Sequence, residues 1–369
     1  MAVSRIDDAG LNVTQYGNKN VIINGAMMIS QRQTSSSNVG NQYVLDRFEV
    51  YKQNTASTYT CSQNSVTDLA GFNNSLKMLC STADTSIASN EEVKIIHKIE
   101  GQDLQRFQKG YSTAQGFTLS FYVKTNKTGT YIVELYDRDN GRDVSGSYTV
   151  SDTGWNRYTI NFPADTTGKF DDDNASSLEI QFWLVAGSAV QGGTLNTSWR
   201  SATDPSSATG QINFADTLNN SWEITGVQLE VGDTATGFEH RSYGDELARC
   251  QRYYYKWYND SVGNVRIAYY GAYNATRLFG PFTVPVPMRI SGPTVTHGTG
   301  TYLQLETIDF ATQLALTNMT IYQATNNPNN LFGMELNVAS GATAGEIYHL
   351  TSFNGGDSTN NFIAFDAEL

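Results

Sequence analysis

Short runs in which apolar and polar residues alternate, set apart by turn residues, constrain the fold of this chain more than any other feature. In Phe117–Lys124 every second residue is a large apolar one, and Glu92–Ile99 repeats the pattern. The turn Asp139–Gly141 between two further runs is a hairpin signal. Successive side chains of a strand point to opposite faces, so each run offers one face to a core. The succession of runs up to about residue 235 predicts an antiparallel β-sandwich of the jelly-roll type.

A helical periodicity occupies residues 243–257. Ser242 and Asp245 match a capping box, and the acidic residues of the first turn are favoured by the helix dipole. Strand-like runs resume afterwards and predict a second, smaller β-sandwich. The apolar stripe of the expected helix is formed by Leu247, Cys250, Tyr254 and Trp257.

These patterns predict an all-β chain with two antiparallel β-sandwiches, the first of jelly-roll type, linked by one α-helix. We expect an N-terminal arm over residues 1–20, the jelly roll over 21–241, the linker helix over 242–258 and the C-terminal sandwich over 259–369. The arm is short, polar and interrupted by glycine, so it has no core of its own. Such segments order against a partner, and we therefore interpret the arm as a docking segment.

Charge and composition exclude several classes of function. The formal net charge is −12 and no basic run occurs, so we expect no nucleic-acid partner. The N-terminus lacks the basic start and apolar stretch of a signal peptide, and no run approaches the ~20 apolar residues that span a bilayer. We therefore expect synthesis in a cytoplasm and no membrane insertion. The three cysteines are widely spaced, which favours buried apolar positions over a metal site or disulfides.

We find no catalytic motif and predict no metal and no cofactor. The four histidines show no metal-ligand spacing, and no Gly-x-Ser-x-Gly turn occurs. The acidic turn Asp137–Asp143 has oxygen ligands at alternate positions, as in a calcium loop, but arginines intrude and a plain hairpin is the favoured interpretation. Paired carboxylates for glycoside hydrolysis stay open, because they meet only in the fold. The candidates on predicted strands are Glu134, Glu179, Glu223 and Glu230.

Three tryptophans are candidates for glycan binding, which needs an aromatic platform flanked by planar polar groups. Trp183 falls on the strand face opposite Phe182, and Trp199 lies in a polar loop where an apolar ring needs an explanation. Trp155 is the third candidate. The alternative for each is packing in a core or in a subunit interface.

Three stretches of the sequence resemble a family of tailed-bacteriophage tail-fibre and virion structural proteins. The first comprises Asn20–Met27 (NVIINGAM), Gln31–Arg32 and Asp46–Phe48. The second runs from Trp222–Gly232 (WEITGVQLEVG) through Phe238–Glu239 to Arg249–Tyr254, and the third is Phe365–Leu369 (FDAEL). The segment Gln228–Gly232 is also similar to the last strand of carbohydrate-binding jelly-roll modules.

The resemblance implies a non-enzymatic structural subunit of a virion, with a sugar-binding-like sandwich, a C-terminal β domain and a possible role in binding host surface polysaccharide. Fibres of this kind are commonly trimers, so we expect a homotrimer. The aromatic run beside the expected helix supplies its candidate interface, Leu247, Tyr253, Tyr254, Tyr255 and Trp257. Contact with other virion proteins is expected through the apolar residues of the arm, Val3, Ile6, Leu11 and Val13.

Two alternatives remain at this point. Phage appendages include polysaccharide depolymerases, which would use the strand glutamates as a pair. A capsid-decorating or head-fibre protein differs from a tail fibre only in what the N-terminal arm contacts. The sequence therefore leaves the location open between tail and head.

Overall fold

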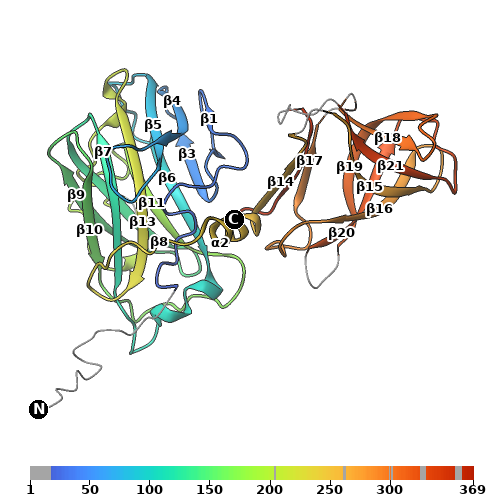
Figure 1. Cartoon of the computed structure of the whole chain (residues 1–369). Coiled ribbons are helices and arrows are strands. Elements are labelled where there is room, and N and C mark those ends of the chain that lie inside the picture. Colours follow the sequence, from blue (N-terminus) through green and yellow to red (C-terminus); the bar gives the residue numbers. More distant parts are fainter. Residues whose placement is uncertain are drawn as a thin grey trace, which may run out of the picture. The chain divides into compact units, whose positions relative to one another are not determined.

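The protein is described by a computed structural model that covers residues 18–202, 205–260, 263–298, 300, 302–324, 330–353 and 360–369. The chain divides into two compact units between Ser242 and Tyr243. Strands dominate both units, and α2 (Tyr243–Gln251) is the one α-helix among the described residues (Figure 1). The predicted all-β fold class is confirmed. The docking residues Val3, Ile6, Leu11 and Val13 lie outside the described residues.

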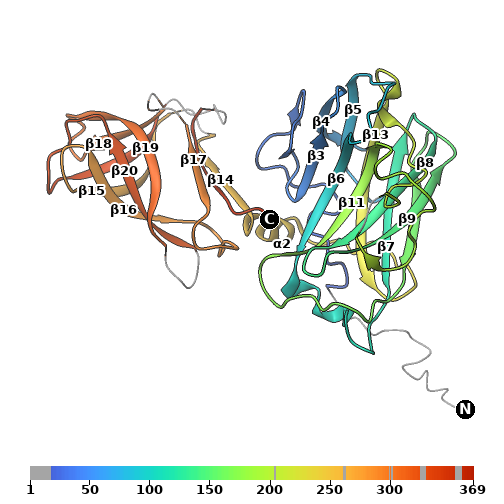
Figure 2. The ribbon, with the colours of Figure 1, turned by 180° about the vertical axis from the view of Figure 1, so that it is seen from behind.

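Two antiparallel sheets form the N-terminal unit, which is the predicted jelly-roll-type sandwich (Figures 1 and 2). In spatial order, the six-stranded sheet contains β1 (Ser35–Ser36), β4 (Thr58–Ser65), β5 (Asn74–Thr82), β13 (Ser221–Val231), β7 (Phe117–Thr125) and β10 (Asn156–Phe162). The seven-stranded sheet contains β12 (Arg200–Ser201), β9 (Arg142–Val150), β8 (Gly129–Asp137), β11 (Ser176–Ala186), β6 (Glu92–Glu100), β3 (Phe48–Gln53) and β2 (Gln42–Tyr43). Short 3-10 turns occupy Gly101–Asp103, Gln105–Phe107 and Phe214–Asp216.

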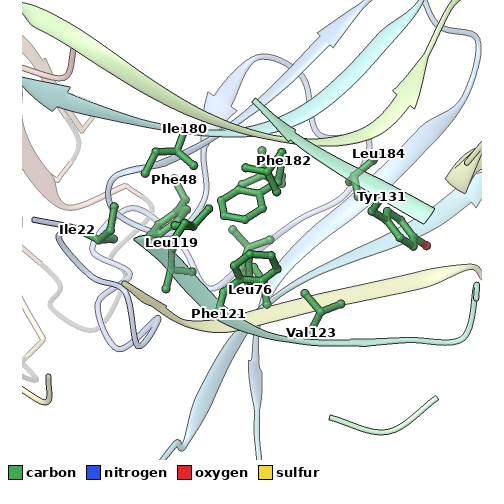
Figure 3. Close-up of a cluster of buried hydrophobic side chains, with 14 of the residues drawn as sticks. Ile22, Phe48, Leu76, Leu119, Phe121, Val123, Tyr131, Ile180, Phe182 and Leu184 are labelled. Carbon is green, nitrogen blue, oxygen red and sulfur yellow. The ribbon is translucent and has the colours of Figure 1, made fainter. Parts of the chain in front are cut away.

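The core between the two sheets is built by the alternation seen in the sequence. Leu119, Phe121 and Val123 of β7 are fully buried, and they face Ile180 and Phe182 of β11 in the opposite sheet (Figure 3). Truncating one of these rings to alanine typically costs about 3–5 kcal/mol, because lost transfer energy adds to the cavity that remains. This core fixes which residues of the seven-stranded sheet point away from the sandwich.

The first and second resembling stretches meet in space and form one buried hydrogen-bonded hub. The side chain of Asn20 donates to the carbonyl of Val227 (3.1 Å) and accepts from the amide of Leu229 (3.1 Å). Val227 in turn donates to the carbonyl of Gly25 (2.9 Å), and the amide of Asn20 donates to Glu239 (2.8 Å). The matching residues therefore tie the start of the unit to β13.

The apolar run Val21–Ile23 forms an irregular buried segment and not a strand. It lies beside β13, whose ladder with β7 changes register at a bulge between Thr225 and Gln228. Isolated bonds such as Val21 N–H to the Leu229 carbonyl (3.2 Å) take the place of a continuous pairing.

The C-terminal unit closes six of its strands into a barrel where the sequence predicted a second sandwich. Closure removes the exposed sheet edges that an open sheet of this size would leave. A separate three-stranded sheet contains β14 (Tyr254–Tyr258), β22 (Phe362–Asp366) and β17 (Thr294–His297). Around the barrel, the strands are β15 (Val265–Ala272), β16 (Arg277–Thr283), β20 (Leu331–Val338), β19 (Gln313–Ala324), β18 (Leu303–Thr307) and β21 (Ile347–Ser352).

The helix predicted over residues 243–257 ends six residues early, at Gln251. Tyr254–Tyr258 forms strand β14 instead and pairs with β22. Aromatic residues favour the pleated, half-buried surface of a strand, and the ladder to β22 decides against continuation of the helix. The expected apolar stripe is thus split between two elements.

Most of the candidate interface residues are consequently packed against other parts of the C-terminal unit. Leu247 is half-buried on α2, and Tyr253 and Tyr254 are buried. Tyr255 and Trp257 pack against the apolar core of the unit. An oligomer contact through these residues remains a prediction.

None of the helices found in the described part of the chain has the length and apolar character that a bilayer crossing requires.

Candidate functional site

The outward face of the seven-stranded sheet is hollowed into a cleft of about 360 Å³. Strands β3, β6, β11 and β8 form its floor, because alternation turns every second side chain of these strands away from the core. The floor is polar and aromatic, with residues such as Tyr51, Lys94, Gln181, Glu179 and Tyr136.

Planar polar groups on the cleft floor are held in place by one another. The Lys94 ammonium donates to Oε1 of Gln181 (3.0 Å), and Nε2 of Gln181 donates to Oε2 of Glu179 (2.7 Å). Lys94 also pairs with Glu92 (2.8 Å). Glu179 and Gln181 are two residues apart on β11, so they share this face. The arrangement presents amide and carboxylate groups in fixed orientations.

Two tyrosines missed by the sequence analysis flank this floor. Tyr51 comes from β3 and Tyr136 from β8, and both are half-buried. Two strands lie between β3 and β8, so three strand spacings separate the rings by roughly 14 Å across the sheet. Burial is the largest cause of the raised pKa of Tyr51, and neighbouring carboxylates add to it. Strand alternation does predict an outward Tyr51, because its neighbour Val50 points into the core and successive side chains point to opposite faces.

Trp183 closes one end of the cleft. It points away from the sandwich core, as alternation predicts, but only 1% of it is exposed because Val190 and Ala208 pack over it. Its indole N–H donates to Oε2 of Glu134 (3.1 Å), and the Lys94 ammonium lies 3.8 Å from the ring centroid. The ring is therefore a wall of the cleft and not an open platform.

Glu134 has the most unusual electrostatic environment in the cleft. Burial raises its pKa to about 7, and the nearby Lys94 ammonium partly opposes this effect. The carboxyl group therefore exchanges its proton near neutral pH.

The other two candidate tryptophans lie elsewhere, so the three are not brought together. Trp155 is half-buried and donates its indole N–H to Asp68 (2.9 Å). Trp199 donates to the carbonyl of Pro163 (2.8 Å) and packs against the buried ring of Phe117, with centroids 5.8 Å apart. Neither tryptophan lines the cleft.

Of the four strand glutamates, two share the cleft and two do not. Glu134 and Glu179 both line it. Glu223 lies on the six-stranded sheet, where it accepts hydrogen bonds from Asn64 (2.9 Å) and Ser75 (2.7 Å). Glu230, on the same strand, accepts from the amide of Thr236 (2.8 Å). Only the first two are placed to act as a pair.

In the acidic turn compared with a calcium loop, Asp137 is paired with a cation from outside the turn, the Lys109 ammonium. The Lys109 ammonium donates to Asp137 (2.5 Å) and to the carbonyls of Thr167 (3.0 Å) and Gly168 (2.8 Å). It also pairs with Asp165 at 3.1 Å, and the side chains of Lys109 and Asp137 are fully buried. The turn is the β8–β9 hairpin that the sequence favoured.

A larger hollow of about 1000 Å³ opens at the sandwich edge beside β10 and β13. The single aromatic ring of its lining, Phe162, is buried and only 2% exposed. No ring is therefore presented for stacking, and the smaller cleft is the better candidate site.

Comparison with known proteins gives likenesses of structure alone. No protein-family model matches the sequence, and no curated protein matches it. The C-terminal family 22 carbohydrate-binding module of Clostridium thermocellum Xyn10B aligns with 60% of this chain and 100% of its own, at 9% identity and a TM-score of 0.30. A CBM4 structure aligns with 56% of this chain and 97% of its own, at 11% identity and a TM-score of 0.28. TmCBM61, solved with β-1,4-galactotriose, aligns over 57% and 98%, at 9% identity and 0.29.

Proposed function

We propose that this chain is a non-enzymatic structural subunit of a tailed-phage virion, and that its N-terminal unit binds a host surface polysaccharide in the cleft. The observation that carries the glycan proposal is the pair Tyr51 and Tyr136 on either side of a floor of fixed planar polar groups. The virion proposal rests on the three resembling stretches, 20–48, 222–254 and 365–369.

The two tyrosines suit an extended saccharide more than a single sugar. The register places Tyr51 level with Trp183, and Tyr136 level with Glu179, which is four residues earlier on β11. The rings are thus also offset by roughly 13 Å along the strands. Sugar rings would stack on the tyrosines, while hydroxyl groups between them bond to Gln181 and Glu179. Ligand sites of this composition combine apolar faces with a few placed polar groups.

The first test is binding of fluorescently labelled protein to intact host cells, with and without their surface polysaccharide. We expect saturable binding that disappears with the polysaccharide. The double variant Tyr51→Ala/Tyr136→Ala should lose it by at least about tenfold, since two stacking contacts are removed. Tyr111→Ala is the matched control, because Tyr111 is an exposed tyrosine of the same unit outside the cleft. Full binding by the double variant would exclude the cleft.

The virion proposal has separate consequences. We propose a homotrimer, with an interface that uses the half-buried Leu247, Tyr255 and Trp257; Tyr253 and Tyr254 are buried and leave the set of candidates. Attachment to the tail or the head is proposed through Val3, Ile6, Leu11 and Val13. Light scattering should give three times the chain mass. Immunoelectron microscopy of phage particles should place the protein on a tail appendage, whereas label over the head would favour the capsid-decorating alternative.

One observation favours the enzymatic alternative. Glu134, with its pKa raised to about 7, lies in the same cleft as Glu179, and a glycosidase needs one carboxyl group protonated near neutral pH. Release of reducing sugar from host polysaccharide, abolished in Glu134→Gln, would establish a depolymerase. We expect none over prolonged incubation, because Glu134 is buried and held by the Trp183 indole N–H.

A further inference from the structure

An aromatic surface lies on the outside of the C-terminal barrel, and we call its rings Tyr273, Phe279 and Tyr322 the barrel platform. Tyr273 is 68% exposed and Tyr322 is 63% exposed, and Phe279 between them is half-buried. The centroid of Phe279 lies 5.9 Å from that of Tyr273 and 4.8 Å from that of Tyr322. The three rings therefore form one continuous apolar area on a face that the core does not use.

A glycine keeps this area open. Gly271 is exposed and sits directly opposite Phe279 in the β15–β16 ladder. A Cβ at this position would meet only the Phe279 carbonyl oxygen, at 4.0 Å, and the backbone there does not require glycine. Glycine inside a strand weakens the strand and often marks the close approach of a ligand. Gly271 therefore leaves open space beside Phe279 that the packing of the fold does not require.

A locked pair of planar polar groups borders the platform. Nε and Nη2 of Arg277 donate to the two carboxylate oxygens of Glu335, each at 2.7 Å. Asn337 donates to the same carboxylate (3.1 Å), and the guanidinium carbon of Arg277 lies 5.2 Å from the Phe279 ring centroid. The pair uses two of the guanidinium's five N–H groups, so hydrogen-bonding capacity remains beside the rings.

We propose that the barrel platform is a second saccharide-binding surface, separate from the cleft, which takes a neutral hexopyranose. The apolar face of the sugar would lie on Phe279, and Tyr273 and Tyr322, whose ring planes are inclined to that of Phe279 by 78° and 60°, would contact its edges. Its hydroxyl groups would bond to Arg277 and Glu335. We expect a neutral sugar because the positive charge of Arg277 and the negative charge of Glu335 already neutralise each other. This proposal does not depend on the cleft.

The size of the platform favours a sugar over a protein partner. Full cover of the exposed parts of three rings would bury roughly 300–400 Å². A stable protein interface needs about 800 Å² on each partner. Rings bordered by orienting polar groups match the composition of small-ligand sites.

The test uses the full chain on a panel of immobilised oligosaccharides built from glucose, galactose, mannose, their N-acetylated forms and uronic acids. We expect at least one neutral probe whose apparent affinity falls by at least about tenfold in Tyr273→Ala/Tyr322→Ala, because its stacking area is removed. Gly271→Thr should lose the same probe while keeping its melting temperature, since a β-branched residue suits a strand and blocks only the approach. Tyr258→Ala, a change at an exposed tyrosine outside the barrel, is the control.

The cleft variant Tyr51→Ala/Tyr136→Ala separates the two sites, because the platform probe should still bind to it. Failure of the cleft proposal would leave this result unchanged. The platform proposal is overturned if no probe depends on Tyr273 and Tyr322, or if Gly271→Thr binds as the wild type does. A change of oligomeric mass in the platform variant, with unchanged glycan binding, would overturn it in favour of a protein contact.

Discussion

Each unit contains a pair of oppositely charged side chains, which is buried in the sandwich and lies at the surface in the barrel. In the sandwich, the Lys109–Asp137 pair is fully buried, with carbonyl oxygens completing its hydrogen bonds. In the barrel, the Arg277–Glu335 pair lies at the surface, and its side chains are 40% and 18% exposed. Charges taken out of water must be fully paired, whereas exposed pairs contribute little to stability. The comparison therefore separates groups that hold the fold from groups that are accessible to a ligand.

The largest expected effect is that of Lys109→Ala. Removing one partner of a buried pair typically costs about 3–5 kcal/mol, because Asp137 is left buried without its cation, whereas Asp165 keeps its pair with Arg142. Urea unfolding followed by tryptophan fluorescence reports this well, since four of the five tryptophans lie in the N-terminal unit. Lys124→Ala is the control, because its pair with Asp68 is exposed. Equal midpoints for Lys109→Ala and Lys124→Ala would contradict the assignment.

Calcium offers an independent check on the same group. The oxygen atoms of Asp137, Asp165, Thr167 and Gly168 surround the Lys109 ammonium. We therefore expect calcium to leave the unfolding midpoint of the wild type unchanged. A rise in the midpoint with added calcium would show that the acidic turn accepts a metal after all.

The next effect concerns Glu134 and is a dependence on pH. Its pKa rises from an ordinary 4.5 to about 7 in the folded protein, so between these values the folded state binds more protons than the unfolded state. Stability should therefore increase as pH falls from about 7 to 4.5, by at most about 3 kcal/mol. Glu134→Gln should remove this contribution, which is seen as the difference between the two unfolding curves across that range. Parallel curves would show that Glu134 titrates normally.

A smaller effect is expected at the hub of the resembling stretches. A Cβ on Gly25 would lie 2.2 Å from the Val227 carbonyl oxygen, so Gly25→Ala must displace backbone. Overpacking of this kind costs about 1–3 kcal/mol. Gly40→Ala is the control, because a Cβ there meets nothing within 4 Å. A loss of stability in Gly25→Ala with unchanged glycan binding would assign the matched residues to the fold and not to a ligand.

Strand alternation predicted most of the fold, and the places where it failed have physical causes. It placed Phe121 and Phe182 in the core because a period of two is a local property of the chain. It could not foresee that Tyr254–Tyr258 pairs with β22, since that partner lies more than a hundred residues away. Closure of the barrel is likewise set by pairings between distant strands, such as β15 with β21.

The candidate site was only partly within reach of the sequence. Alternation turned Trp183 away from the core, yet the segment that covers it, with Val190 and Ala208, belongs to a loop whose path no local pattern defines. Tyr51 and Tyr136 become neighbours of one cleft only through the order of β8, β11, β6 and β3. The barrel platform depends on strand order in the same way.

The smallest stability effect should come from Arg277→Ala, which makes it the sharpest test of the comparison. The pair with Glu335 is exposed and screened by solvent, so the unfolding midpoint of the C-terminal unit should stay within error of the wild type. Saccharide binding to the platform should fall nonetheless, because the group that orients the hydroxyl groups is gone. Trp257, the one tryptophan of this unit, provides a fluorescence signal for the midpoint. A large loss of stability would mean that Arg277, like Lys109, serves the fold, and the contrast between the two units would fail.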